Sequence, residues 1–218
     1  MNSSSVTNSM KQPRVVPGFE QIKRYWDPTS KGWAAKILPG EFYVSRGGEM
    51  IVTTLGSCVA ACARDRDYGV GGMNHFLLPI RDGDPERWTL DPANLATRYG
   101  NHAMEQLINR LLKLGARREN LEVKLFGGGR VLKDITTDVG RRNGEFALEY
   151  CDVERLNVLA RDFGGLYPRK VRYFPDTGRA LCKKLYRTRN ETLVEREKRL
   201  LHELEEEPVS GGDVDLFE

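Results

Sequence analysis

Short apolar runs separated by glycine dominate the sequence from Glu41 onward and limit what the chain can fold into. Four of them, EFYVSR, MIVTTLG, CVAACARD and VGGMNHFLLP, follow one another between residues 41 and 79. Runs of this length, rich in apolar and β-branched residues and bounded by glycine, indicate strands. The first half of the folded region is therefore predicted to be rich in β-structure.

Two helices are predicted to pack with these strands. After a loop over residues 80–92, apolar residues recur at helical spacing and Gly115 follows them as a C-cap; they are Ala103, Met104, Leu107, Ile108, Leu111 and Leu112. A second helix is expected from Asp138 to about Leu156, because one helical face would carry Phe146, Ala147, Tyr150 and Cys151.

The remaining apolar runs are expected to complete the β-structure. LEVKLFGGG, NVLARDFGG, KVRYFP and RALCKKL have the length and composition of strands, and PDTG between the last two suits a tight turn. Because strands flank both helices in the sequence, the predicted fold class is α/β. The architecture that follows is a mixed α/β sandwich, in which a β-rich sheet packs with two main helices.

Three segments are expected along the chain. Residues 1–38 mix polar, basic and isolated aromatic residues without helical or strand periodicity, which predicts a partly ordered N-terminal extension. Residues 39–187 form the predicted domain. Residues 188–218 are expected to be a C-terminal tail with a solvated, acidic helix, whose apolar residues at near-helical spacing are Val194, Leu200, Leu201 and Leu204.

Charge and hydropathy exclude several classes of partner. The chain of 218 residues has 34 basic and 31 acidic side chains, a net charge of +3, so no strong field would hold it on nucleic acid or an anionic membrane. Its apolar runs are far shorter than the roughly 20 residues of a membrane-spanning helix. The N-terminus lacks the apolar region of a secretory signal, so a cytoplasmic protein with reduced cysteines is expected.

Cys58 and His75 form the pair most suggestive of chemistry. If residues 65–68 are a four-residue hairpin loop, Arg64 pairs with Gly69 and the same register pairs Cys58 with His75. Directly opposed residues have Cβ atoms roughly 4.5 to 5.5 Å apart, so thiol and imidazole would meet. An imidazolium next to a thiol is expected to lower the thiol pKa and create a nucleophile.

The residues before the cysteine suit an oxyanion site. Gly56 and Ser57 leave the Cys58 N–H free to approach a substrate carbonyl. A structural alternative remains open at this point, because free cysteines often behave as small buried hydrophobes and a single histidine is more often structural than catalytic. Cys151 and Cys182 are expected to have this core role.

A metal site is not expected, and neither is any other cofactor. Cys58, Cys62 and His75 superficially resemble zinc ligands, with His102 as the only fourth candidate. Residues four apart on a strand are about 13 Å apart, which is too far for one ion. The glycines of residues 127–129 lack the lysine and hydroxyl residue of a phosphate loop, and are expected to pack against the Cys58 site instead.

The blocks LGSCVAAC and GVGGMNHFLLP resemble the signature of the CheD family, the chemoreceptor glutamine deamidases of bacterial and archaeal chemotaxis. The resemblance continues in order through RYGNHAMEQLINRLLKLGA, KLFGGG, DVGRRNGEFALEY, ARDFGG and the PDTG hairpin, from about Gly40 to Leu185. It implies a CheD-like α/β sandwich with a catalytic Cys-His-Thr triad. The cysteine and histidine would be Cys58 and His75, and the threonine Thr53 or Thr54, with the family's usual spacing favouring Thr53.

The implied activity is hydrolysis of receptor glutamines to glutamates through a thioester, with release of ammonia. The implied partners are the cytoplasmic helices of chemoreceptors and a CheC-type phosphatase. Two alternatives remain open from the sequence: a CheD-like binding module without turnover, and a transglutaminase or thiol protease that uses similar chemistry. Ammonia release without peptide cleavage or amine incorporation would distinguish the deamidase from both.

Overall fold

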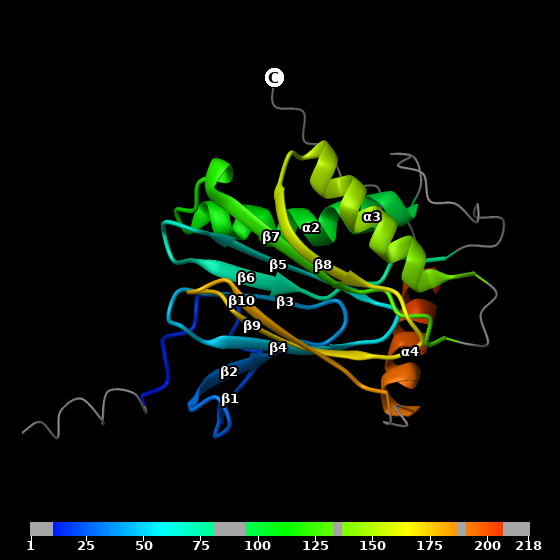
Figure 1. Ribbon diagram of the computed structural model, residues 1–218, viewed down its shortest axis with the longest axis horizontal. Helices are drawn as coiled ribbons and strands as arrows, with labels where there is room; N and C mark the ends of the chain where they lie inside the picture. The colour runs from blue at the N-terminus through cyan, green and yellow to red at the C-terminus, as the bar shows by residue number, and fades with distance from the viewer. Residues whose placement is uncertain (1–10, 81–94, 133–136, 187–190, 207–218) are drawn as a thin grey trace, which may run out of the picture.

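The short apolar runs form two five-stranded sheets that stack on each other in the computed structural model (Figure 1). The structure describes residues 11–80, 95–132, 137–186 and 191–206. The first sheet has the order β1 (Lys23–Asp27), β2 (Gly32–Lys36), β4 (Met50–Leu55), β9 (Arg169–Phe174) and β10 (Arg179–Lys184). The second has the order β3 (Phe42–Ser45), β6 (Gly71–Asn74), β5 (Val59–Asp65), β7 (Leu121–Gly127) and β8 (Asn157–Phe163).

Helices cover the outer face of the second sheet. α2 (Leu95–Lys113) packs on β3, β5 and β6, and α3 (Val139–Val153) packs on β5, β7 and β8 (Figure 1). A short 3₁₀ helix, Arg118–Asn120, leads from α2 into β7. The expected α/β sandwich with two main helices is confirmed. α2 ends just before Gly115, whose positive φ suits the expected C-cap, and α3 ends at Val153, three residues before the expected end.

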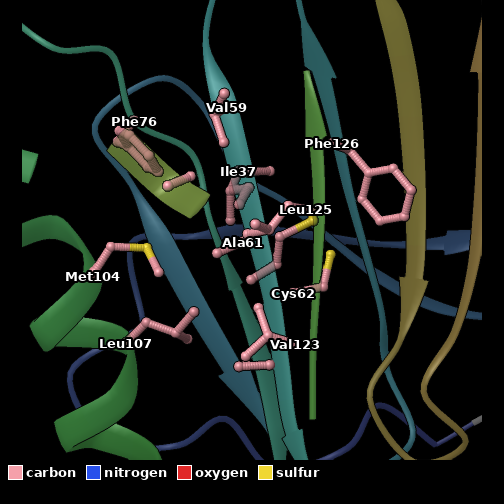
Figure 2. Packing of buried hydrophobic residues seen from close by; sticks show 14 of the residues in the cluster. Ile37, Val59, Ala61, Cys62, Phe76, Met104, Leu107, Val123, Leu125 and Phe126 are labelled. Atoms are coloured by element: carbon pink, nitrogen blue, oxygen red, sulfur yellow. The ribbon is translucent and has the colours of Figure 1, made fainter. Parts of the chain in front are cut away.

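The core lies on both faces of the second sheet. Met104 and Leu107 project from α2 toward the strands (Figure 2). Along β7, the side chains of Val123 and Leu125 point to one face of the sheet and that of Phe126 to the other. Alternation along a strand sends successive side chains to opposite faces, so one strand contributes to both the helix layer and the space between the sheets. Strands β5 and β6 of the second sheet are therefore buried on both sides, whereas β9 of the first sheet alternates buried and partly exposed residues.

The N-terminal segment contains two strands that were not expected from the sequence. β1 and β2 pair antiparallel, and β2 extends the first sheet by pairing parallel with β4. Arg24 of β1 forms a 2.6 Å ion pair with the buried Glu49, which also accepts a hydrogen bond from Tyr43. The absence of periodicity was misleading, because β1 is partly buried along much of its length instead of alternating.

The expected hairpin register is also wrong, by two residues. Arg64 pairs with Gly71 and Cys62 with Met73, and the Asp65 N–H donates to the Val70 carbonyl. The four-residue loop is thus residues 66–69. The Asp65 carboxylate stabilises this turn by accepting hydrogen bonds from the Asp67 and Tyr68 N–H groups. A shift of two preserves the face of every side chain, but Cys58 and His75 do not pair directly.

The C-terminal helix is present but is not solvated on all sides. α4 (Glu191–Glu206) stands against one end of the two stacked sheets (Figure 1). Leu201 and Leu204 are buried, and Val194 and Leu200 pack partly buried against the core. Among the described residues, no helix is long and apolar enough to span a bilayer.

Candidate functional site

Residues 56–58 connect the first sheet to the second, and hydrogen bonds to their carbonyl groups fix their backbone conformation. The Gly56 and Cys58 carbonyls accept hydrogen bonds from the Gly129 and Gly128 N–H groups, each 2.8 Å long. The Ser57 carbonyl accepts a third 2.8 Å bond from the Asn143 side-chain amide. With these carbonyls engaged, the loop is fixed before any ligand arrives.

Glycines are required behind this loop, as expected for residues 127–129. Gly127 has φ +124°, and a Cβ there would lie 2.1 Å from the Cys58 carbonyl oxygen. A residue with a side chain at position 127 would push the loop of residues 56–58 away. Asn143 was not foreseen from the sequence; from α3 it also accepts the Leu78 N–H, and so links the Cys58 loop to the segment that follows His75.

His75 directly follows β6, and a chain of hydrogen bonds fixes its ring. The Thr53 hydroxyl lies 2.7 Å from His75 Nδ1 and 2.9 Å from the Ile37 carbonyl. A carbonyl can only accept, so the single hydroxyl proton goes to Ile37 and Thr53 must accept from Nδ1–H. This assigns the proton of neutral His75 to Nδ1 and leaves Nε2 with a lone pair.

The buried Nε2 of His75 has no hydrogen-bond partner among the described residues. Burial lowers the pKa of His75 from 6.5 to about 3, because the imidazolium would lose its hydration. His75 is therefore neutral at physiological pH, and its unshared nitrogen is able to take a proton from a neighbour.

Cys58 is fully buried and lies close to this histidine. The Cys58 sulfur, a ring nitrogen of His75 and a carboxylate oxygen of Glu197 lie within 4.8 Å of one another. Burial raises the pKa of the Cys58 thiol well above its ordinary value, and the charge of Glu197 raises it further. The expected imidazolium-stabilised thiolate is thus not the state in this structure, in which thiol and imidazole are both neutral.

Thr54 is placed differently from its neighbour. Thr53 is 1% exposed and faces His75, whereas Thr54 is partly exposed. Successive side chains of β4 point to opposite faces, so only one of the two reaches the ring. Of the two threonines, Thr53 is therefore the one that contacts the His75 ring.

Glu197 is the member of the site that was missed from the sequence. Its carboxylate accepts hydrogen bonds from the Gly56 N–H (2.8 Å), the Ser57 N–H (2.8 Å), the Ser57 hydroxyl (2.6 Å) and, more weakly, the Cys58 N–H (3.4 Å). A signal did exist: Glu197 shares the helical stripe of Val194, Leu201 and Leu204, and a carboxylate within an apolar stripe is unusual.

A cation is poorly suited to the group formed by Cys58, His75 and Glu197, although their ligand atoms are close together. Both carboxylate oxygens already accept N–H or O–H groups, whose positive ends would face the ion. The other cysteine and the other histidine considered as ligands lie elsewhere: Cys62 pairs with Lys124 of β7, and His102 is exposed on α2.

Acid is expected to destabilise the protein through His75. Its folded-state pKa lies below the ordinary value, so its contribution to stability is complete above about pH 6.5 and is lost as pH falls toward 3. The free energy of unfolding should fall by about 1 kcal/mol per pH unit between pH 6 and 5. Urea titrations at several pH values should show a shallower dependence in His75→Gln; parallel profiles would contradict the assignment.

The comparisons with known proteins agree with one another. The family model described as CheD chemotactic sensory transduction matches residues 77–184. A probable chemoreceptor glutamine deamidase CheD of Halorhodospira halophila is 67% identical over 205 residues, 94% of each chain. Proteins with the same name from Thiobacillus denitrificans and Hahella chejuensis are 52% and 43% identical, over 88% and 94% of this chain and 94% and 95% of theirs.

Proposed function

The chain belongs to the CheD family, and on that basis we propose that it is a protein-glutamine deamidase acting on chemoreceptors. The observation that carries the proposal is the arrangement of Cys58, His75 and Thr53 around backbone N–H groups that already bind a carboxylate. A buried thiol beside a histidine with a free Nε2, facing oxyanion donors, is suited to acyl transfer.

The reaction begins when Nε2 of His75 takes the Cys58 proton and the sulfur attacks the carboxamide carbon of a glutamine. Thr53 keeps accepting from Nδ1–H while the ring is positively charged, which holds its orientation. The oxyanion accepts hydrogen bonds from the N–H groups of residues 56–58. A side chain at position 56 would crowd this loop, because its Cβ would lie 2.6 Å from the Val131 side chain and 2.7 Å from the carboxylate now bound there.

His75 then returns the proton to the departing nitrogen, so that the C–N bond breaks and ammonia leaves a thioester on Cys58. A water molecule then gives a proton to Nε2 of His75 and attacks the thioester carbon. The C–S bond breaks, the thiol regains its proton, and the product is a glutamate side chain. The substrate helix gains one negative charge.

Receptor cytoplasmic helices are the proposed substrate, and the cytoplasm is the proposed compartment, since the names of the relatives specify chemoreceptor glutamines. A CheC-type phosphatase is proposed as a second partner on family resemblance alone. The division into an N-terminal extension, a domain over residues 39–187 and a C-terminal tail stays a prediction. The Thr53 hydrogen bond to Ile37 argues that the extension contributes to the site.

Incubation with cognate receptor cytoplasmic fragments tests the function directly. We expect ammonia release, and fragment peptides in which mass spectrometry finds glutamate in place of glutamine. The reaction should proceed equally well with a metal chelator, because both Glu197 oxygens in the group formed with Cys58 and His75 already accept hydrogen bonds and are poorly placed to bind a cation. Activity that is lost to the chelator and restored by zinc would contradict this mechanism. The absence of any conversion would favour a binding module.

A further inference from the structure

The helix α4 places a glutamate side chain where the proposed reaction forms one. The Glu197 carboxylate is completely buried, and it is bound by the N–H groups of residues 56 and 57 next to the nucleophile. Glutamate is the product of glutamine hydrolysis, so the Glu197 side chain has the length and the terminal carboxylate of that product. Glu197 is also presented from the middle of a helix, as a receptor glutamine would be.

Glu197 does not have the geometry of a catalytic triad member. A carboxylate that orients a histidine accepts the N–H of the ring nitrogen remote from the nucleophile. That position is taken by the Thr53 hydroxyl, 2.7 Å from Nδ1. Glu197 instead binds the amides of the nucleophile loop, and its charge raises the pKa of the Cys58 thiol. Its effect on the nucleophile is therefore inhibitory.

The rest of α4 binds the body of the protein through a limited surface. One apolar stripe, with Leu201 and Leu204 buried, packs against the core, and the other faces carry exposed charged residues. Isolated helices of about this length are marginally stable in water, so α4 depends on its docking for its structure. A helix whose docking depends on an apolar stripe and on the Glu197 carboxylate can be displaced by a competing helix.

We infer that α4 is a tethered, product-like inhibitor that occupies the substrate position, and that a receptor helix must displace it before Cys58 can react with a receptor glutamine. The inference rests on the proposed deamidase function for the identity of the competing helix. It does not depend on that function for the occlusion of Cys58, which is a property of this chain alone. Docking of α4 therefore sets the fraction of molecules with an accessible nucleophile.

Alkylation of Cys58 by iodoacetamide tests the occlusion without any receptor. Peptide mapping separates Cys58 from the partly exposed Cys182. In Glu197→Ala, Cys58 should react at least about 10-fold faster than in the wild type, because the thiol loses both its cover and the adjacent negative charge. Glu195→Gln, a change on the exposed side of the same helix, should stay within about 2-fold of the wild type.

Glu197→Gln tests the product position and keeps the shape of the side chain if the alanine variant does not fold. A carboxamide is now held at the nucleophile, so the enzyme should convert residue 197 back to glutamate. Water is consumed and ammonia released, at a rate per molecule that does not depend on protein concentration. The double variant Cys58→Ala/Glu197→Gln should keep its glutamine.

The outcomes separate this inference from the proposed function. Faster alkylation in Glu197→Ala without conversion of residue 197 or of receptor fragments would support the occlusion and overturn the deamidase. Wild-type receptor deamidation, combined with equal alkylation of Cys58 in the wild type, Glu197→Ala and Glu197→Gln, would overturn the inference and leave the deamidase standing.

Discussion

Cys58→Ala should abolish ammonia release from receptor fragments, with a fall in turnover of at least about 1000-fold, because without the sulfur no thioester forms. The fold should be retained, since alanine fits within the volume of the fully buried cysteine and the Cys58 carbonyl keeps its bond to Gly128. Turnover is followed by mass spectrometry of the fragments, and folding by thermal unfolding monitored by circular dichroism.

Cys62→Ala provides the matched control. Cys62 is equally buried, and it lies in β5, four residues after Cys58 and outside the group formed by Cys58, His75 and Glu197. Both substitutions remove one buried sulfur and should cost comparable stability. Only the change at Cys58 should remove activity; full deamidation by Cys58→Ala would exclude it as the nucleophile.

Thr53→Ala should lower kcat by about 100-fold while KM changes little, because the hydroxyl orients the base and does not touch the substrate. It also leaves the Ile37 carbonyl and His75 Nδ1 without their partner, which should cost about 1 to 3 kcal/mol of stability. Thr53→Ser keeps the hydroxyl and should restore most of the turnover. Steady-state kinetics and urea titrations measure the two effects separately.

Thr54→Ala is the neighbouring control, since Thr54 is partly exposed and points to the other face of β4. It should retain nearly normal kcat. If Thr54→Ala alone abolished turnover in a folded protein, the roles of the two threonines would be exchanged. If neither change affected kcat, the orientation of His75 would not depend on a hydroxyl.

The sequence was most informative where local pattern and local structure coincide. α2, α3 and the β9–β10 hairpin follow from apolar spacing and from residues with turn preferences, which act over a few positions. The Cys58 and His75 blocks pointed to one site even though the assumed register was wrong. The error of two residues kept both on the correct face, because side-chain direction repeats every second residue.

What the sequence did not reveal depends on contacts between distant segments. The choice between Thr53 and Thr54 could not be made by counting, because the chain changes sheets at Gly56 and alternation does not continue through that bend. Ile37 and Asn143 act through a backbone carbonyl and a side-chain amide whose partners lie 16 and 86 residues away. Glu197 is 141 residues from Gly56, and neither residue's local sequence predicts the other.

The burial of Cys58 also bears on how the protein withstands oxidants. Peroxides react with thiolates that solvent can reach, and carry them through sulfenic acid to irreversible acids. With its sulfur fully buried and its pKa raised, Cys58 offers neither access nor thiolate while α4 is docked. Oxidative damage at Cys58 should then accumulate with the time for which α4 is undocked. Inactivation by oxidants should therefore increase with turnover and not with storage time.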